Sequence, residues 1–489
     1  SAIRGDCNTP RASHTVFIVR NDASTSDILF QTADTTWQAY NNYGGNNLYS
    51  GSPAGRAYKV SYNRPFFTRI VDNGQDWVFN AEYPMVRWLE ANGYDVSYFT
   101  GVDSDRYGNL IRNHKLFMSN AHDEYWSGQQ RANVEAARDA VLNPVNLAFF
   151  SGNEVFWKTR WENNITNSSG ALGTDSYRTM VCYKETHAGA KIDPLPNVWT
   201  GTWRDPRFSP PADGGRPENA LIGTIFTVND GATTSITVPQ QDGLMRFWRN
   251  TTVANLAVGS SETLPSGTLG YEWDEDLDNG FRPAGLVRLS TTIVPGAPVL
   301  TDYGSNFGSG LANHALTLYK AQSGAIVFGS GTVQWAWGLD SVHDRAGTPV
   351  SPSMKQATVN LFADMGVQPS TIQPGLTQAT PSTDATAPAS VITSPAAGAN
   401  VQPGALVIVS GTASDIGGRV GGIEVSVDDG STWHPANGRT SWTYSWNTPT
   451  TNGPANIRVR SVDDSLNMEI PGLGINVTVG TGGDTTPPT

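Results

Sequence analysis

The sequence predicts an α/β domain built on a parallel sheet, followed by an all-β sandwich of the immunoglobulin-like (Ig-like) kind. Two observations lead to this prediction. In the first 150 residues or so, apolar strand-like segments alternate with helix-like segments, which is the pattern of parallel strands joined by crossover helices. After residue 389, several short segments of alternating polarity follow one another with turns between them, which is typical of a β-sandwich.

The alternation in the first region can be assigned segment by segment. Residues 83–92 place apolar side chains at helical spacing, and residues 127–143 form a second helical stretch that ends before a proline. Residues 14–30 are expected to form a strand, a turn and a second apolar segment. Residues 35–51 are rich in aromatic side chains, Asn and Gly, which indicates a loop. Further strands are expected at 95–100 and 115–120, and residues 145–157 are expected to be a strand that runs into a glycine-containing turn.

The rest of this domain, which we place at residues 1–366, is expected to be mostly β. Short strand-like segments, among them 246–251, dominate the stretch from about 160 to 330, which we interpret as a β-rich insertion. The apolar segment 324–340 predicts a last core strand with its loop, and residues 354–366 predict the closing helix.

The C-terminal part begins with a linker. Residues 367–388 are rich in Pro, Thr, Ser and Ala and lack periodicity. The Ig-like sandwich is expected at 389–480. Its core is expected to contain three tryptophans, Trp433, Trp442 and Trp446. Because the linker sequence DATAP returns as DTTPP near the C-terminus, residues 481–489 are expected to start a further linker that leads to another Ig-like module.

The composition excludes several classes of function. The formal net charge of -12 and the lack of a basic stripe argue against nucleic acid as a partner, because phosphate contacts need clustered Lys and Arg. No apolar run is long enough to span a bilayer. Cys7 and Cys182 form neither a disulfide framework nor a zinc motif, although they could pair with each other. A surface rich in Gly, Thr, Ser and Asn favours an exported protein, extracellular or at the cell surface, whose signal peptide this chain lacks.

Four polar residues in a row follow the strand expected at 115–120: His122, Asp123, Glu124 and Tyr125. In an extended segment, His122 and Glu124 point to the same side and can bind one ligand, whereas Asp123 and Tyr125 point away. An imidazole and a carboxylate suit zinc, iron or manganese, and they suit general acid–base catalysis equally. The alternative is a solvated turn in which Glu124 caps the next helix.

Other candidates lie in loops expected at the same edge of the sheet, because functional loops of a parallel sheet follow the carboxyl ends of its strands. Asn153 could hold a carbonyl oxygen or an oxyanion, or it could be a simple turn residue. Tyr40 and Tyr43 offer phenolate oxygens, which suit ferric iron, and their alternative role is packing.

Titratable residues in the later part of the domain give weaker signals. The segment 270–280 could bind Ca²⁺ or supply one catalytic carboxylate, although it lacks the spacing of an EF-hand loop. Its carboxylates are Glu272, Asp274, Glu275, Asp276 and Asp278. His343 and Asp344 follow the last core strand, whereas His314 is expected to pack. Cys182 lies in an apolar run and is not expected to be a nucleophile. The motifs GxSxG, GxGxxG, HExxH and the Walker loop are absent from the sequence.

Seven segments occur in an order that resembles the large (beta) subunit of bacterial N,N-dimethylformamidase and its secreted relatives. They are TTWQAYNNYGGNNLY, AHDEYWS, FFSGNEVFWKTRWE, RTMVCYKET, WTGTWRDPR, RFWRNT and GTVQWAWGLD. The resemblance covers roughly residues 14–370. It implies a glutamine-amidotransferase-like (flavodoxin-like) core and a mononuclear iron site, with tyrosine and glutamate ligands, that hydrolyses a small amide. It also implies an N-terminal portion of the polypeptide that this chain lacks.

The resemblance can be carried over motif by motif. It makes Tyr40 and Glu124 ligands of a metal ion, which is expected to be Fe³⁺ with zinc as the alternative. Tyr43 is the nearest candidate for a second tyrosine ligand. Three further residues are assigned to catalysis: His122, Asn153 and Glu272.

Three hypotheses follow. The first is a secreted metal-dependent hydrolase of amide C–N bonds. The second is a non-catalytic extracellular protein that binds carbohydrate or a surface on a degenerate amidase scaffold. Its exposed aromatic residues would then be Trp37, Tyr40, Tyr43 and Tyr49. The third is a glycan-processing hydrolase that uses Glu124 and Glu272, whose carboxyl groups would have to lie about 5–9.5 Å apart.

Overall fold

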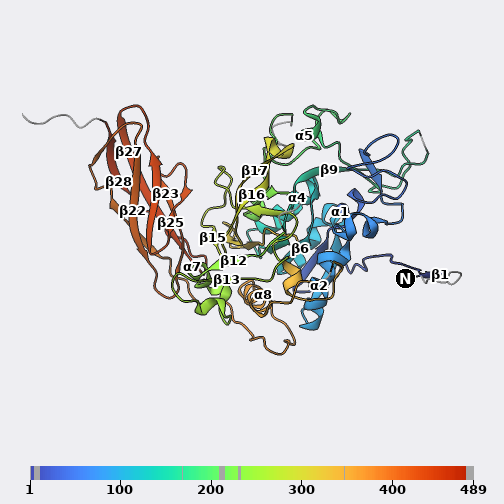
Figure 1. Ribbon diagram of the computed structural model, residues 1–489, viewed down its shortest axis with the longest axis horizontal. Helices are drawn as coiled ribbons and strands as arrows, with labels where there is room; N and C mark the ends of the chain where they lie inside the picture. The colour runs from blue at the N-terminus through green and yellow to red at the C-terminus, as the bar shows by residue number, and fades with distance from the viewer. Residues whose placement is uncertain are drawn as a thin grey trace, which may run out of the picture.

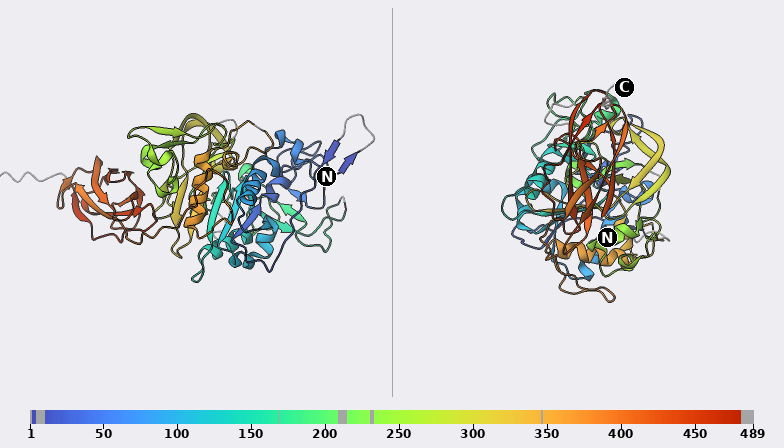
Figure 2. Two further views of the ribbon diagram at one scale, coloured as in Figure 1. Left: turned by 90° about the horizontal axis from the view of Figure 1, so that it is seen from below. Right: turned by 90° about the vertical axis from the view of Figure 1, so that its left-hand side faces the viewer.

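The computed structural model describes residues 2–4, 11–167, 169–208, 215–229, 233–345 and 347–480. Cys7 and residues 481–489, which carry two of the expectations above, lie outside the described residues. A β-sandwich formed by the C-terminal residues lies at one end of the molecule (Figure 1). Most of the parallel strands (blue to cyan) lie in the other part of the molecule (Figure 2).

The N-terminal part is organised around a mixed seven-stranded sheet with the order β15-β18-β19-β8-β6-β3-β5. The strands β5, β3, β6, β8 and β19 pair in parallel, as the alternation of helices and strands predicts. β18 and β15 extend this sheet in the antiparallel sense. The bounds are β3 (Ile28–Thr32), β5 (Val96–Thr100), β6 (Leu116–Ala121), β8 (Asn146–Ser151), β15 (Val287–Arg288), β18 (Thr317–Lys320) and β19 (Ile326–Gly329).

The parallel strands are buried on both faces, and successive side chains enter two different cores. In β6, Met118 belongs to one core and Phe117 to the other, and Phe30 and Leu29 of β3 divide in the same way. Helices cover both faces, which explains why these strands read as continuous apolar runs. Side chains of α2 (Val78–Ala91) and α8 (Pro352–Asp364) belong to the first core and those of α4 (Gly128–Arg138) to the second.

The expected β-rich stretch supplies β15, β18 and β19 to the main sheet and most strands of the smaller sheets beside it. A closed barrel consists of β11 (Ile225–Val228), β14 (Trp273–Glu275), β16 (Thr292–Thr301) and β17 (Asn306–His314). A four-stranded sheet consists of β4 (Lys59–Ser61), β10 (Thr179–Val181), β9 (Trp157–Glu162) and β7 (Tyr125–Ser127). Two-stranded sheets pair β1 (Ala2–Arg4) with β2 (Arg11–Ser13) and β12 (Thr237–Pro239) with β13 (Ser261–Thr263).

The remaining helices are short. The α-helices are α1 (Asp34–Ala39), α3 (Gly101–Arg106), α5 (Glu185–Ala188), α6 (Asn219–Ile222) and α7 (Gln240–Gly243). The 3₁₀ helices are η1 (Thr68–Ile70), η2 (Asp72–Gly74), η3 (Gly108–Asn113), η4 (Arg246–Trp248), η5 (Val253–Asn255), η6 (Asp302–Gly304) and η7 (Trp335–Gly338).

The C-terminal part is a two-sheet β-sandwich. One sheet contains β20 (Ala389–Ser394), β22 (Leu406–Ser414), β26 (Ser441–Asn447) and β25 (Asn437–Gly438). The other contains β21 (Asn400–Val401), β28 (Ile475–Val479), β27 (Gly453–Asp463), β23 (Val420–Ser426) and β24 (His434–Pro435). Trp442 and Trp446 belong to its core as predicted. Trp433 does not, because it is partly exposed and lies under the guanidinium of Arg460 at 4.2 Å.

Three local predictions are wrong. Residues 14–20 form no strand, and Phe17 and Val19 are exposed, so their apolar character does not reflect core packing. The expected loop at 35–51 begins within helix α1, whose six residues are all buried. Residues 246–248 form the 3₁₀ helix η4 rather than a strand.

The sandwich and the N-terminal part are packed against each other. Val462 and Leu466 of the sandwich belong to the main apolar core of the N-terminal part. Around them, the Arg439 guanidinium lies 2.9 Å from the carboxylate of Asp242. The backbone N–H of Arg246 donates to Asp464 Oδ2 at 2.9 Å. The two parts therefore share an interface with an apolar centre and polar contacts. Among the helices of the described residues, none combines the length and apolar character needed to cross a membrane.

The strand that precedes Asn153 offers a test of this core. Phe150 is 1% exposed, and its ring lies 5.0 Å from that of Phe328 and 5.9 Å from that of Phe362. Phe150→Ala should lower the free energy of unfolding of this part by about 3–5 kcal/mol, because it leaves a cavity between packed rings. Denaturant titration followed by tryptophan fluorescence measures this free energy of unfolding. Val141→Ala, at a 92% exposed position, should change the value by less than about 0.5 kcal/mol. Equal effects of the two variants would contradict the assigned core.

Candidate functional site

The topology of the main sheet creates a crevice at one edge. β3 is the first parallel strand of the sheet in the chain, and the next ones lie on opposite sides of it, β5 on one side and β6 on the other. The connections that follow β3 and β6 therefore diverge, and open parallel sheets bind ligands at such a point. Tyr40 follows β3, Glu124 follows β6 and Asn153 follows β8, so all three lie at this edge.

The carboxylate of Glu124 lies at the centre of the site. The side chain is buried, and both of its oxygens lie 2.8 Å from the hydroxyl of Tyr49, which donates to them. The hydroxyl of Tyr40 donates to Glu124 Oε2 at 3.4 Å, and the rings of Tyr40 and Tyr49 stack with centroids 4.4 Å apart. Burial raises the pKa of Glu124, and burial beside Glu124 raises the pKa of each tyrosine well above its usual range.

The second tyrosine at Glu124 is Tyr49, not the predicted Tyr43. Tyr43 is 40% exposed, and its ring packs edge-on against Phe67 at 5.2 Å. Tyr49 reaches the site because the chain folds back on the end of α1, where Leu48 N–H donates to the carbonyl oxygen of Ala39 at 2.9 Å. Asn47 fixes this turn by accepting the N–H of Tyr49 at 2.8 Å. The asparagine-rich segment predicts a turn, but only its path shows which tyrosine returns to Tyr40.

His122 lies beside Glu124, as their spacing in the sequence predicts. Its Nε2 lies 2.8 Å from Glu272 Oε2 and 3.5 Å from Glu124 Oε2. Its Nδ1 lies 2.7 Å from Asp76 Oδ1, and the hydroxyl of Tyr271 contacts the same pair. Burial lowers the pKa of His122, but the surrounding carboxylates outweigh it and raise the pKa well above its usual range. The surrounding carboxylates therefore favour the protonated form of the imidazole.

Asn153 and Glu272 complete the cluster. Asn153 Nδ2 donates to Glu272 Oε2 at 2.8 Å and lies 3.0 Å from His122 Nε2. The residue is held in the left-handed region at φ 48°, and its N–H donates to Asp274 Oδ1 at 2.9 Å. A Cβ at Gly152 would lie 2.8 Å from the carbonyl oxygen of Glu272, so a glycine is needed there. Asn153 Oδ1 is buried and accepts no hydrogen bond from the described residues.

Sequence reasoning missed Lys184, which lies on the other side of the tyrosine pair. Its Nζ is buried 3.2 Å from the centroid of the Tyr49 ring and has no hydrogen-bond partner among the described residues. Burial lowers the pKa of Lys184 to about 7, although the charge of Glu124 opposes this shift. The only signal in the sequence is a lysine directly after the apolar run of β10.

Asp76, Tyr271 and Tyr125 were also missed as neighbours of the site. Asp76 and Tyr271 contact His122 from distant segments of the chain. Tyr125 was expected to point away from Glu124, but its hydroxyl donates to that of Tyr49 at 2.6 Å. Asp123 does point away and accepts a hydrogen bond from Ser119 at 2.9 Å. The cap of α4 is Ser127, not Glu124.

Other predicted candidates lie apart from this cluster. Asp344 pairs with Arg69 at 2.8 Å, and His343 stacks on Trp337. His314 is packed as expected, with its Nε2 2.9 Å from the carbonyl oxygen of Ser330. The carboxylates of segment 270–280 separate: Asp276 pairs with Arg288, and Asp278 pairs with His434. Cys182 is buried in an apolar cluster.

The aromatic surface of the binding hypothesis is also incomplete. Trp37 was expected to be exposed, but it is buried, and its indole N–H donates to Glu82 Oε2 at 2.7 Å. Tyr43 and Tyr49 remain partly exposed. Stacking on a sugar would therefore lack the largest of the four proposed rings.

Comparison with known proteins places this site in a family context. Residues 2–348 match the model of the N,N-dimethylformamidase beta subunit-like, C-terminal family, and residues 388–459 match that of a bacterial Ig domain. The N,N-dimethylformamidase beta subunit of Paracoccus aminophilus is 25% identical over 160 residues. This alignment covers 32% of the chain and only 19% of that relative.

Two solved structures are covered over nearly their whole length by the alignment, but they match less than half of this chain. The fibronectin(III)-like modules of Clostridium thermocellum CbhA share 22% identity, with 19% of this chain and 93% of theirs covered and a TM-score of 0.16. Domains 4 and 5 of the S-layer protein SbsC share 18% identity, with 40% and 97% covered and a TM-score of 0.15. Both likenesses are too low to support an argument. The family match spans most of the chain, and the chain therefore belongs to the N,N-dimethylformamidase beta subunit-like, C-terminal family.

Proposed function

We propose that this protein is a metal-dependent hydrolase of amide C–N bonds. The observation that carries the proposal is the convergence of two tyrosine hydroxyls on the buried carboxylate of Glu124. His122, Glu272 and Asn153 lie next to it within hydrogen-bond distance of one another. Family membership supports an amide as the substrate, because the relative from Paracoccus aminophilus is named as a subunit of an N,N-dimethylformamidase.

The donor set fits a hard, highly charged cation. Tyr40, Tyr49 and Glu124 offer only oxygen atoms, and two phenolates with one carboxylate carry three negative charges. Tyr49 lies 2.8 Å from both oxygens of Glu124, so one ion could replace the protons that these groups now share. Zinc sites are usually built from nitrogen and sulfur ligands, which makes Fe³⁺ the better match. We assign these three residues as ligands, with Tyr49 in place of Tyr43.

An ion held by these residues would supply Lewis-acid activation of the amide carbonyl group and of the attacking water. Glu272 is then placed to accept the proton of that water. His122, whose protonated form the neighbouring carboxylates favour, can donate from Nε2 to the departing amine nitrogen as the C–N bond breaks. Asp76 holds Nδ1 of His122, so Nε2 faces the cluster. The products are a carboxylic acid and an amine, and the proton on Glu272 restores His122.

Asn153 would orient the substrate. Its Nδ2 reaches the Glu272–His122 pair, while its buried Oδ1 has no described partner. A substrate N–H or an active-site water could occupy this free acceptor, and the amide N–H₂ could stabilise a developing oxyanion. The backbone hydrogen bond to Asp274 fixes the residue in this position.

The core is proposed to be glutamine-amidotransferase-like, that is, flavodoxin-like. The order β5-β3-β6-β8-β19 corresponds to 2-1-3-4-5 in chain order, which is the flavodoxin-like order and supports this assignment. We also propose domains at 1–366 and 389–480 with a linker at 367–388. The start of the Ig match at residue 388 supports the second boundary. An extracellular location is proposed from the composition and the Ig-like module.

Metal content tests the ligand assignment. Protein loaded with iron and freed of excess metal should hold about one iron per chain by plasma mass spectrometry. Glu124→Gln should lose nearly all of it, and Tyr49→Phe should bind iron at least about tenfold more weakly, because each removes an oxygen anion from the donor set. Tyr43→Phe is the matched control and should bind like the wild type. Iron retained in full by Glu124→Gln would refute the assignment.

Hydrolysis of small N-alkyl amides tests the role of Glu272. Glu272→Gln should lower kcat by about 10²–10⁴, since the proton acceptor is lost, while iron content stays unchanged. Release of amine from a panel of formamide-type substrates is the readout. Asp278→Asn, in the same segment but paired with His434, should retain wild-type kcat. If Glu272→Gln is as active as Asp278→Asn, Glu272 is not the general base.

A further inference from the structure

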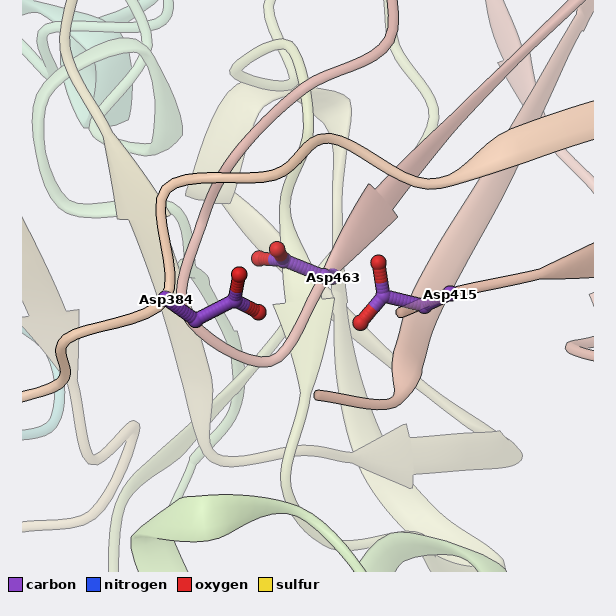
Figure 3. Close-up of side chains that lie close together, drawn as sticks. All are labelled: Asp384, Asp415 and Asp463. Carbon is purple, nitrogen blue, oxygen red and sulfur yellow. The ribbon is translucent and has the colours of Figure 1, made fainter. Parts of the chain in front are cut away.

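A second group of acidic side chains lies at the junction between the linker and the sandwich. Asp384 belongs to the segment before β20, Asp415 directly follows β22, and Asp463 ends β27. One carboxylate oxygen from each lies within 4.8 Å of the other two. The three carboxylates come from separate segments and lie side by side (Figure 3). Oxygen ligands of one calcium ion lie at most about 5 Å apart, because Ca–O distances are about 2.3–2.6 Å.

Asp384 and Asp415 are half-buried as residues, but three of the six carboxylate oxygens in the group are buried without partners among the described residues. Both oxygens of Asp415 and the Oδ2 of Asp384 are shielded from solvent and accept no hydrogen bond from any described residue. Asp463 is completely buried, and among the described residues its oxygens accept hydrogen bonds from Ser465 and Asn467 alone. A buried ionised carboxylate is costly unless a cation or hydrogen-bond donors compensate it. Three neighbouring carboxylates with three unpartnered oxygens therefore point to a missing cation.

The backbone beside the cluster leaves room between the carboxylates. A Cβ at Gly418 would lie 2.8 Å from Asp384 Oδ2 and 2.9 Å from Asp415 Oδ2. It would also lie 2.8 Å from the Oδ1 of Asp464, a fourth carboxylate at the edge of the group. Asp464 already accepts the backbone N–H groups of Arg419 and Arg246. The absence of a side chain at position 418 therefore keeps this space open.

Two basic side chains near the cluster, Arg246 and Lys320, have their hydrogen-bond partners elsewhere. The guanidinium of Arg246 is held by Asp364 at 2.7 Å, and Lys320 Nζ lies 3.4 Å from the carbonyl oxygen of Ser465. Within the described part of the chain, no ion pair is formed by Asp384, Asp415 or Asp463. Burial, together with the charge of Asp415, raises the pKa of Asp463 to about 6. Arg246 and Lys320 lie close enough for their charges to interact with Asp384 and Asp463, but among the described residues neither forms an ion pair with the cluster.

We infer that Asp384, Asp415 and Asp463 bind a calcium ion. The donors are all oxygens, which excludes a preference for soft metals. Calcium accepts six to eight oxygens in irregular geometry, whereas magnesium demands a near-ideal octahedron and keeps most of its waters. Carboxylates from three separate segments suit the more permissive ion. This site does not depend on the proposed hydrolase function.

Calcium at this position would stiffen the junction. It would join the linker to the ends of β22 and β27, and Asp464, next to Asp463, already contacts Arg246 of the N-terminal part. The ion would therefore fix how the sandwich is attached. Extracellular modules bind calcium with dissociation constants of about 10⁻⁴–10⁻³ M, which suits a structural site outside the cell.

Calorimetric titration of the chelator-treated full chain with CaCl₂ tests the inference. We expect one calcium per chain and, at about 5 mM CaCl₂, a rise in Tm of about 2 °C or more. Asp415→Asn should abolish both. Asp429→Asn, an exposed aspartate of the same sandwich, should retain both. Glu124→Gln should also bind calcium normally, which separates this site from the one at Glu124.

Two further measurements guard against a misfolded variant. Without calcium, Asp415→Asn should be at least as stable as the wild type, because it removes one of several neighbouring negative charges. Gly418→Ala should weaken calcium binding by placing a methyl group against the carboxylates. The inference fails if the wild type binds no calcium at 5 mM, if Asp415→Asn binds it normally, or if magnesium binds more tightly than calcium.

Discussion

The site depends on the hydrogen bonds and charges that compensate the buried carboxylate of Glu124. A carboxylate removed from water needs compensation, and here it comes from two tyrosine hydroxyls, with the charges of His122 and Lys184 nearby. Tyr40 and Tyr49 belong to the segment after β3, His122 to the segment of Glu124 itself and Lys184 to the segment after β10, so three segments of the chain meet at Glu124. The carboxyl ends of β3 and β6 bring the first two segments together, because the strand order reverses between them.

The proposed chemistry follows from the different partners of the two ring nitrogens of His122. On one side, Asp76 and Tyr271 fix Nδ1, and on the other Nε2 faces Glu272 and Glu124. The imidazole thus lies between the proposed metal ligands and the proposed base. Carboxylates that surround it raise its pKa. The acidic group of Asp384, Asp415 and Asp463 lies at the junction with the sandwich. It differs from the site at Glu124 because, among the described residues, no hydroxyl or imidazole donates to its oxygens.

Periodicity in the sequence predicts the central part of the fold and the core of the site. Buried parallel strands and amphipathic helices leave strong local patterns, which is why α2, α4, α8 and the strands between them could be assigned. The alternation of side chains in an extended segment also predicts that His122 and Glu124 share a side. Residues 14–20 mislead because an exposed apolar segment has the same composition as a strand.

The remaining site residues depend on tertiary structure. Tyr49 occupies the position predicted for Tyr43 because a turn folds back on α1. The spacing of the tyrosines in the sequence does not reveal the path of that turn. Asp76, Lys184 and Tyr271 reach the site from distant segments, so only the assembled fold reveals them. We propose that Tyr40, Tyr49 and Glu124 bind one iron ion, and anomalous diffraction at the iron edge from crystals of the iron-loaded protein is the decisive experiment. We expect a single anomalous peak among these three side chains. A peak elsewhere, or no peak there, would refute the proposed iron site.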